Sequence, residues 1–174
     1  MSRPKPDLKS IEMLVLDVDG VLTDGRIITH QDGSESKCFH VLDGHGLRMW
    51  MRAGLKVAWL SGRHSLATTC RAEELQIPHV LQDCHDKLPA LQKLLAELGV
   101  PPRNVAYIGD DVMDLPVMHF VGFAVAVANA VEEVKQCAAH VTARAGGAGA
   151  VREVIEYILK RSGRWPSLVK MYGL

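Results

Sequence analysis

The stretch "LVLDVDGVLTDG", from Leu14 to Gly25, decides the fold. It begins as a hydrophobic strand and then places two carboxylates, Asp17 and Asp19, two residues apart. Adjacent carboxylates repel each other and are costly to bury unless a cation neutralises them. The stretch therefore predicts a buried strand that ends in a charged site. A third carboxylate, Asp24, is more typical of a turn or cap residue than of a catalyst.

The composition is that of an ordinary globular protein. Of the 174 residues, 48% are hydrophobic and 23% are charged, and 20 basic side chains balance 20 acidic ones. This balance argues against nucleic acid or an anionic membrane as a partner, so any anion binding must be local. The sequence shows no signal-peptide pattern, no run near the ~20 apolar residues of a membrane helix, and no C-x-x-C pair among its cysteines. We expect a reduced, cytoplasmic protein that forms one domain over residues 1–174.

Short apolar segments alternate with longer amphipathic ones along the chain. The apolar segments predict strands, at residues 13–18, 56–61, 79–82, 104–109, 123–128 and 140–143. The amphipathic segments predict helices, near residues 44–53, 64–76, 85–98, 111–121, 130–138 and 147–161. Strands that alternate with helices indicate an α/β fold with a doubly wound parallel sheet.

Two segments depart from this alternation. Residues 26–41 have two strand-like arms around the turn residues Gln31 to Ser34, which predicts a β-hairpin inserted directly after the first strand. The tail, residues 161–174, is too short for a domain. Its apolar side chains are expected to pack on this subunit or on a neighbour; they are Trp165, Leu168, Val169, Met171 and Tyr172.

Chemically active side chains follow the predicted strands at their carboxyl ends, where open α/β sheets form their sites. In chain order they are Asp17 and Asp19, then Ser61 and Arg63, then Lys87, then Asp110, Asp111 and Asp114. Converging carboxylates need a cation, and an all-oxygen donor set suits Mg²⁺. A hydroxyl and an ammonium beside such a site suit a phosphate dianion. One Asp can then attack phosphorus, while a carboxyl two residues later handles the proton.

Each motif alone is weak, because Asp is common in turns and at helix N-termini. The order of the four elements is what makes the pattern specific. Together, "DVDGVLTDG", Ser61, Lys87 and "GDDVMD" resemble the motifs of haloacid dehalogenase-superfamily phosphatases. The resemblance implies the HAD-like Rossmannoid fold without a large cap domain. By position it implies these roles: nucleophile Asp17; general acid/base Asp19; phosphoryl binding by Ser61 and Lys87; Mg²⁺ held by Asp17, the Asp19 carbonyl and Asp110, supported by Asp111 and Asp114.

Further segments are similar to the small superfamily members that hydrolyse 3-deoxy-D-manno-octulosonate 8-phosphate, a precursor in lipopolysaccharide synthesis. They include the hairpin, "HVLDGHGLRM" (40–49), "SGRH" (61–64) and "AGGAGAVREV" (145–154). The resemblance implies a homotetramer whose active sites are completed by a neighbouring subunit. The implied contacts to the anionic sugar phosphate are Asp19, His40, Val41, Leu42, Asp43, Gly44, Arg48, Arg63, Arg71 and Lys87.

Several alternatives stay open from sequence. Arginine suits a carboxylate, but Arg48 and Arg71 taken alone are more typical of solvated surface residues. Leucine at positions 42 and 66 departs from the polar and basic residues frequent in the family, which leaves a nine-carbon keto-acid phosphate as an alternative substrate. A non-catalytic oligomerisation module and phosphate transfer to another acceptor are further alternatives. We expect the glycine-rich segment at 145–150 to be flexible, and Arg144 and Arg152 beside it to reach an anion or to serve a helix start.

Overall fold

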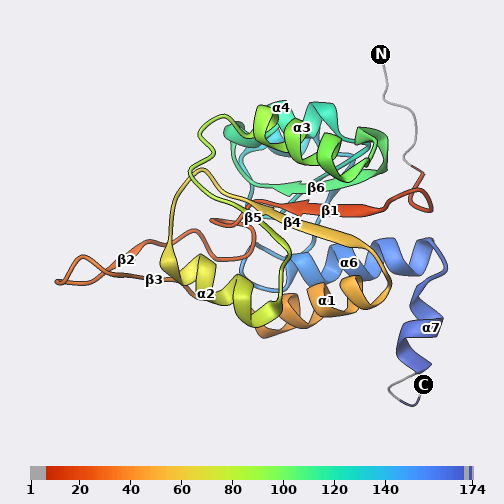
Figure 1. Ribbon diagram of the computed structural model, residues 1–174, viewed down its shortest axis with the longest axis horizontal. Coiled ribbons are helices and arrows are strands. Elements are labelled where there is room, and N and C mark those ends of the chain that lie inside the picture. Colours follow the sequence, from red (N-terminus) through yellow and green to blue (C-terminus); the bar gives the residue numbers. More distant parts are fainter. Residues whose placement is uncertain (1–6, 171–172, 174) are drawn as a thin grey trace.

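The structure, a computed structural model, describes residues 7–170 and 173, and within them six parallel strands form one twisted sheet (Figure 1). The strands are β1 Met13–Leu16, β4 Lys56–Leu60, β5 His79–Leu81, β6 Val105–Gly109, β7 Phe123–Ala126 and β8 His140–Val141. Their order in the sheet is β5-β4-β1-β6-β7-β8. The chain therefore winds outward from β1 on one side and then on the other, which confirms the predicted doubly wound sheet.

Helices cover both faces of this sheet. They are α1 Val41–Arg52, α2 Leu66–Leu75, α3 Lys87–Leu98, α4 Leu115–Phe120, α5 Glu132–Cys137, α6 Ala150–Arg161 and α7 Trp165–Lys170, with 3-10 turns η1 Pro102–Asn104 and η2 Val112–Asp114. In Figure 1, α1, α2 and α6 lie on one face, and α3 and α4 lie on the other. The strands are buried between these layers, which explains why their sequences are almost continuously apolar.

The register of the central strands sets the position of the charged residues. Leu16, the last residue of β1, lies beside Trp59 of β4 and Ile108 of β6. The residues that follow these strands therefore emerge at the same edge of the sheet. Asp17 and Asp110 reach this edge from neighbouring strands, at the point where the winding reverses and open α/β sheets bind their ligands.

The hairpin forms where it was predicted, although its paired part is short. Strands β2 Ile28–Thr29 and β3 Glu35–Ser36 pair antiparallel, and they project from the body of the molecule (Figure 1). At the turn, the backbone N–H of Ser34 donates to Oδ1 of Asp32 at 2.9 Å. An Asx turn of this kind holds the reversal without any help from a core.

The tail packs on its own subunit through α7. Leu168 is buried, and the ammonium of Lys160 lies 4.9 Å from the centre of the Trp165 ring. Val169 is only partly buried. The predicted packing residues Met171 and Tyr172 lie outside the described residues. Within the part of the chain that the structure describes, we find no helix with the length and apolar character needed to span a membrane.

Candidate active site

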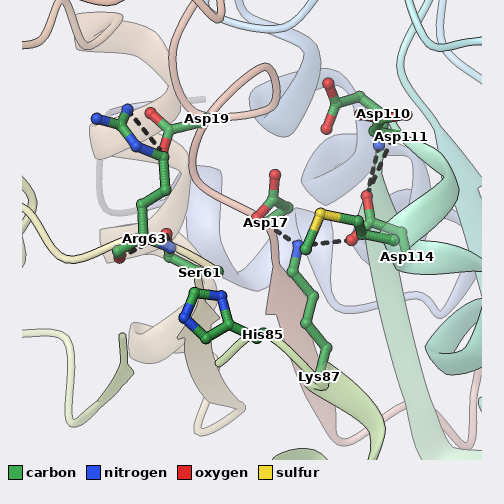
Figure 2. A pocket seen from close by; sticks show the side chains of 11 residues that line it. Asp17, Asp19, Ser61, Arg63, His85, Lys87, Asp110, Asp111 and Asp114 are labelled. Atoms are coloured by element: carbon green, nitrogen blue, oxygen red, sulfur yellow. Dashed lines mark hydrogen bonds and ion pairs between the residues drawn. The ribbon is translucent and has the colours of Figure 1, made fainter. Parts of the chain in front are cut away.

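A cavity of about 370 Å³ opens at the carboxyl edge of the sheet (Figure 2). Four separate stretches of chain contribute its lining: Asp17 and Asp19; Ser61, Gly62 and Arg63; His85 and Lys87; Asp110, Asp111, Met113 and Asp114. The structure therefore brings together the residues for which the sequence predicts catalysis and metal binding. Among the other predicted substrate contacts, Arg63 lies here too.

Lys87 is a buried cation at the bottom of this cavity. It begins α3, and its Nζ donates to Oδ1 of Asp17 and Oδ1 of Asp114, each at 2.7 Å. Burial alone would lower the pKa of Lys87, but the carboxylates of Asp17 and Asp114 outweigh it and hold the pKa above its ordinary value. The ammonium therefore stays charged and fixes the position of the Asp17 carboxylate.

Asp114 supports the site through its own complete set of hydrogen bonds. Its Oδ1 accepts from Lys87 at 2.7 Å and from the Tyr107 hydroxyl at 2.6 Å. Its Oδ2 accepts from the backbone N–H groups of Asp110 and Asp111, at 2.9 and 3.3 Å. A carboxylate offers about four lone-pair sites. Because all four are used, Asp114 orients its neighbours and has no free oxygen for a metal.

Asp17 and Asp110 are the other two carboxyl groups that lie beside Asp114. Carboxylate oxygens of Asp17, Asp110 and Asp114 lie within 4.8 Å of one another. Burial, and then the Asp17 carboxylate, raises the pKa of Asp110 to about 8. Burial raises the pKa of Asp17 to about 6, against the opposing effect of Lys87. Among the described residues, Oδ1 of Asp110 is buried without a hydrogen-bond partner. Two repelling carboxylates and an unpaired oxygen fit a hard divalent cation such as Mg²⁺.

Gly20 allows the chain that follows β1 to lie close to Asp110, which follows β6. Its φ is +91°, and a Cβ built there would lie 2.1 Å from Oδ2 of Asp110. Any side chain would therefore displace the Asp110 carboxylate as well as strain the backbone. The glycine of "DVDG" is therefore needed to make room for Asp110, which follows β6, as well as for its own turn.

Asp19 and Arg63 lie on the opposite side of the cavity from Asp110 (Figure 2). Nη1 of Arg63 is 3.9 Å from Oδ2 of Asp19. The hydroxyl of Ser61 donates to the carbonyl of Arg63 at 3.0 Å, and it accepts from the Arg63 N–H at 3.2 Å. A phosphate oxygen would accept from Ser61 once this hydroxyl turns away from the carbonyl.

The other predicted substrate contacts lie outside this cavity. They are His40, Val41, Leu42, Asp43 and Gly44 at the start of α1, Arg48 further along α1, and Arg71 on α2. Val41 and Leu42 are exposed. Arg48 donates to Oε1 of Gln76 at 2.7 Å, and Arg71 pairs with Glu74 at 2.6 Å. Within a single subunit, these residues do not reach the Asp17 carboxylate.

Asp43 has a structural explanation. It is buried, and its Oδ1 accepts from the backbone N–H of Arg152 at 2.7 Å, in the first turn of α6. A carboxylate at a helix N-terminus satisfies a free N–H and interacts favourably with the helix dipole. Arg152 itself pairs with Glu156 at 2.7 Å, and it lines a separate hollow together with Arg144. In this subunit Asp43 links α1 to α6.

The sequence predicts a flexible glycine-rich segment, but in the structure hydrogen bonds hold this segment in place. The N–H of Gly147 donates to the carbonyl of Val21 at 3.0 Å, and the N–H of Gly146 donates to Oδ1 of Asn129 at 2.8 Å. A Cβ on Gly146 would lie 1.6 Å from the carbonyl oxygen of Gly20. The glycines are needed because this backbone lies directly against the loop that carries Asp19. Asp24, on the same loop, is an exposed turn residue.

Sequence reasoning missed two polar contacts. Tyr107 is fully buried on β6, and its hydroxyl needs a partner, which it finds in Asp114. A tyrosine inside the strand "NVAYIG" was the available signal. Lys37, in the hairpin, pairs with Asp19 and Glu35. The residues around Lys37 do not predict its burial, because a lysine in a polar hairpin is ordinarily solvated.

The chain matches known proteins along most of its length. The family model for haloacid dehalogenase-like hydrolases matches residues 57–155. The 3-deoxy-D-manno-octulosonate 8-phosphate phosphatase KdsC of Escherichia coli (strain K12) is 44% identical over 90% of this chain and 83% of that protein. The Yersinia pestis KdsC is 46% identical over 86% of this chain and 80% of that protein.

The comparison with solved structures indicates the same family. The 3-deoxy-D-manno-octulosonate 8-phosphate phosphatase of Moraxella catarrhalis, whose structure holds a magnesium ion, a phosphate ion and KDO, has a TM-score of 0.92 and 40% identity, covering 95% of each chain. The Yersinia pestis enzyme has a TM-score of 0.90 and 43% identity, covering 91% of this chain and 86% of that one. This chain therefore belongs to the haloacid dehalogenase-like hydrolases, in the group that contains the KdsC phosphatases.

Proposed function

We propose that this protein is a Mg²⁺-dependent phosphatase that hydrolyses 3-deoxy-D-manno-octulosonate 8-phosphate to KDO and phosphate, in the synthesis of lipopolysaccharide precursor. The observation that carries the proposal is the Asp17 carboxylate, which Lys87 holds at 2.7 Å in a cavity beside Asp110 and Arg63. This arrangement offers a fixed nucleophile, a buried cation and a place for a phosphate. The relatives named above act on the same substrate class.

The residues divide the reaction into two balanced steps. An oxygen of Asp17 bonds to phosphorus while the bond from phosphorus to the sugar oxygen breaks, and a proton passes from Asp19 to that leaving oxygen. In the second step, a water oxygen bonds to phosphorus while the bond to Asp17 breaks. Asp19 takes the proton that the water gives up, so phosphate leaves and both carboxyl groups return to their starting states.

The remaining groups bind and orient the phosphate. Lys87 supplies positive charge next to the Asp17 carboxylate, and Ser61 supplies a hydroxyl at the cavity wall. Mg²⁺, held by Asp17, Asp110 and the carbonyl of Asp19, would offset the negative charge of nucleophile and phosphate. Asp111 and Asp114 support this site, and Asp114 does so by fixing Lys87 and the backbone of Asp110.

We also propose a cytoplasmic homotetramer in which a neighbouring subunit completes each site. Substrate contacts from the start of α1 and from α2 lie outside the subunit's own cavity, so they would serve a neighbour's. Large apolar side chains are exposed at the starts of α1 and α2, with Val41 at 74% and Leu66 at 73%, and just before β2, with Ile27 at 59%. An apolar region of this kind favours burial between subunits.

A panel of phosphate esters tests the function. Phosphate release is measured with Mg²⁺ for the eight-carbon substrate, for nine-carbon keto-acid phosphates and for sugar phosphates without a carboxylate. We expect the highest kcat/KM for the eight-carbon compound, and loss of turnover with a chelator that added Mg²⁺ reverses. A preference of more than about tenfold for a nine-carbon compound would replace the substrate we propose. No release from any ester would favour a non-catalytic module.

A further inference from the structure

Lys37 lies at the base of the hairpin and is almost completely buried. The exposed fraction of its side chain is 2%, although the hairpin itself projects into solvent (Figure 1). A buried ammonium requires anionic partners, since desolvation without them is costly. Nζ of Lys37 donates to Oδ1 of Asp19 and lies 3.5 Å from Oε1 of Glu35. The hairpin thus places the Lys37 ammonium beside Asp19, which the proposed reaction uses for proton transfer.

Lys37 is part of a ring of alternating charges. Glu35 contacts Lys37 through Oε1 and accepts from Nη2 of Arg63 at 2.5 Å through Oε2. Arg63 in turn lies 3.9 Å from Oδ2 of Asp19. The order Asp19, Lys37, Glu35, Arg63 therefore closes on itself, with two carboxylates between two cations. Such a network restrains each member more than a single exposed pair could.

The two carboxylate oxygens of Asp19 have different surroundings. Oδ1 accepts the hydrogen bond from Lys37. Oδ2 is buried without a hydrogen-bond partner among the described residues, and Asp19 lines the cavity that holds Asp17. An oxygen that accepts from an ammonium is a poor place for a proton, because that proton would face the donor hydrogens. Oδ2, with Nη1 of Arg63 at 3.9 Å, is therefore the oxygen that is open to a substrate group in the cavity.

An aromatic contact holds the base of the hairpin against the sheet, close to the four charged residues. The Phe39 ring stacks on Trp59 of β4 with 6.2 Å between their centres, and Arg71 lies over Phe39 at 6.0 Å. Trp59 is fully buried, so this contact ties the hairpin to the core two residues after Lys37. The position of the Lys37 ammonium is thereby fixed relative to the end of β1.

We propose that Lys37 is a positioning residue for proton transfer: it holds Oδ1 of Asp19, so that Oδ2 gives the proton to the leaving oxygen and takes one from the attacking water. Glu35, itself held by Arg63, keeps Lys37 in place. This inference rests on the proposed function, since it concerns a proton step of that reaction.

If Lys37 positions Asp19 for proton donation, the loss of activity on replacing Lys37 should depend on the leaving group of the ester. A sugar alkoxide is a strong base and must be protonated as it leaves, whereas p-nitrophenolate leaves without a proton. General acid catalysis contributes on the order of 10²–10⁴-fold where it is needed. For Lys37→Met we expect kcat/KM on the best sugar phosphate to fall by on the order of 10²-fold, since misplacement by about 1 Å can have this effect. With p-nitrophenyl phosphate, kcat/KM should change little, because it reports only the steps up to the departure of the leaving group and not the later hydrolysis that both esters share.

The experiment compares kcat and KM on both substrates for wild type, Lys37→Met and Lys37→Arg, with Mg²⁺ present. Lys37→Arg keeps a cation that can hold Oδ1, so its ratio of the two kcat/KM values should lie closer to wild type. Lys93→Met, which changes an exposed lysine of α3, is the matched control and should keep both activities.

Equal losses of kcat/KM on both substrates in Lys37→Met, or no loss on either, would overturn the inference. If Lys37→Met does not fold, Glu35→Gln tests the same ratio, because it weakens the support of Lys37 and leaves the ammonium present. Hydrolysis of both esters by wild type with an unchanged ratio in the variants defeats this inference alone. Wild type that releases phosphate from neither ester defeats the proposed function instead.

Discussion

The carboxyl edge of the sheet and the start of α1 are built in opposite ways. At the sheet edge, Lys87 and Asp114 are buried and every oxygen of Asp114 has a partner. At the start of α1, Val41 and Leu42 are exposed, and on α2 Arg71 pairs with Glu74 of the same helix. The first region is complete within one subunit, whereas the second offers side chains that its own cavity does not use. We infer that bond breaking belongs to the single chain and that recognition of the sugar belongs to the assembly.

The sharpest test of this comparison mixes two defective variants. Asp17→Asn removes the nucleophile, and we expect kcat to fall by on the order of 10⁴-fold or more, as for other essential catalytic groups. Arg71→Ala removes a charged contact worth about 1.5–3 kcal/mol, so kcat/KM should fall about 10- to 150-fold. In the homotetramer that we propose, co-expression of the two variants should give mixed assemblies in which some sites combine an intact Asp17 with an intact Arg71.

Recovered activity above that of the two variants assayed separately would show that subunits share sites. Activity equal to the separate variants would break the comparison, because Arg71 would then act within its own subunit or not at all. Arg103→Ala, which changes an exposed arginine, is the matched control and should leave kcat/KM unchanged. Melting curves of each variant exclude loss of fold as the cause.

The second prediction concerns the support inside the sheet edge. Asp114→Ala leaves Tyr107 and two backbone N–H groups without their acceptor, and it leaves Lys87 paired with Asp17 but not with Asp114. We expect the free energy of unfolding to fall by about 3–5 kcal/mol, because the buried Lys87 charge loses one partner and three further donors lose theirs. Urea unfolding monitored by tryptophan fluorescence measures it.

The control for this variant is Asp111→Ala, which removes an exposed cap on the N–H of Val112. Its effect should be about 1 kcal/mol. Tyr107→Phe removes one of the hydrogen bonds to Asp114 and should also lie near 1 kcal/mol. Equal losses in Asp114→Ala and Asp111→Ala would mean that the buried network adds nothing beyond a surface cap.

The third and smallest effect is the pH dependence of metal binding at the sheet edge. The pKa of Asp17 is raised to about 6 and that of Asp110 to about 8 without metal, so the folded chain binds these protons more tightly than the unfolded one. Their contribution to stability is full below about pH 4, the ordinary carboxyl range, and is lost as pH rises through about 6 to 8. Mg²⁺ needs the deprotonated carboxylates.

The stabilisation that Mg²⁺ gives should therefore grow from pH 6 to pH 8, by about 1.4 kcal/mol per pH unit for one displaced proton. Thermal melting of chelator-treated protein, with and without Mg²⁺, measures it at both values. Asp110→Asn, which lacks one of the titrating carboxyl groups, should show a smaller pH dependence. An Mg²⁺ effect that is the same at both pH values would contradict the assignment of Asp110.

Much of this site could be predicted because each part is a local pattern at the end of a strand. Asp17, Lys87 and Asp110 follow apolar runs, and parallel strands bring their carboxyl ends together. Tyr107 and Lys37 could not be predicted in the same way, since their importance lies in hydrogen bonds to Asp114 and Asp19 that only the folded chain shows. Lys37 is separated from Asp19 by 18 residues, and nothing near it in sequence predicts burial.

The sequence by itself determined the doubly wound sheet, the hairpin after the first strand and the set of residues at the charged edge, because hydrophobic period and turn chemistry are local properties. The tertiary structure alone decided which carboxylates are saturated and which are open. It gave Asp114 four partners, left Oδ1 of Asp110 without one, and distinguished the two oxygens of Asp19. Hydrogen-bond partners depend on distances of a few tenths of an ångström between distant segments, and only the packed chain fixes these.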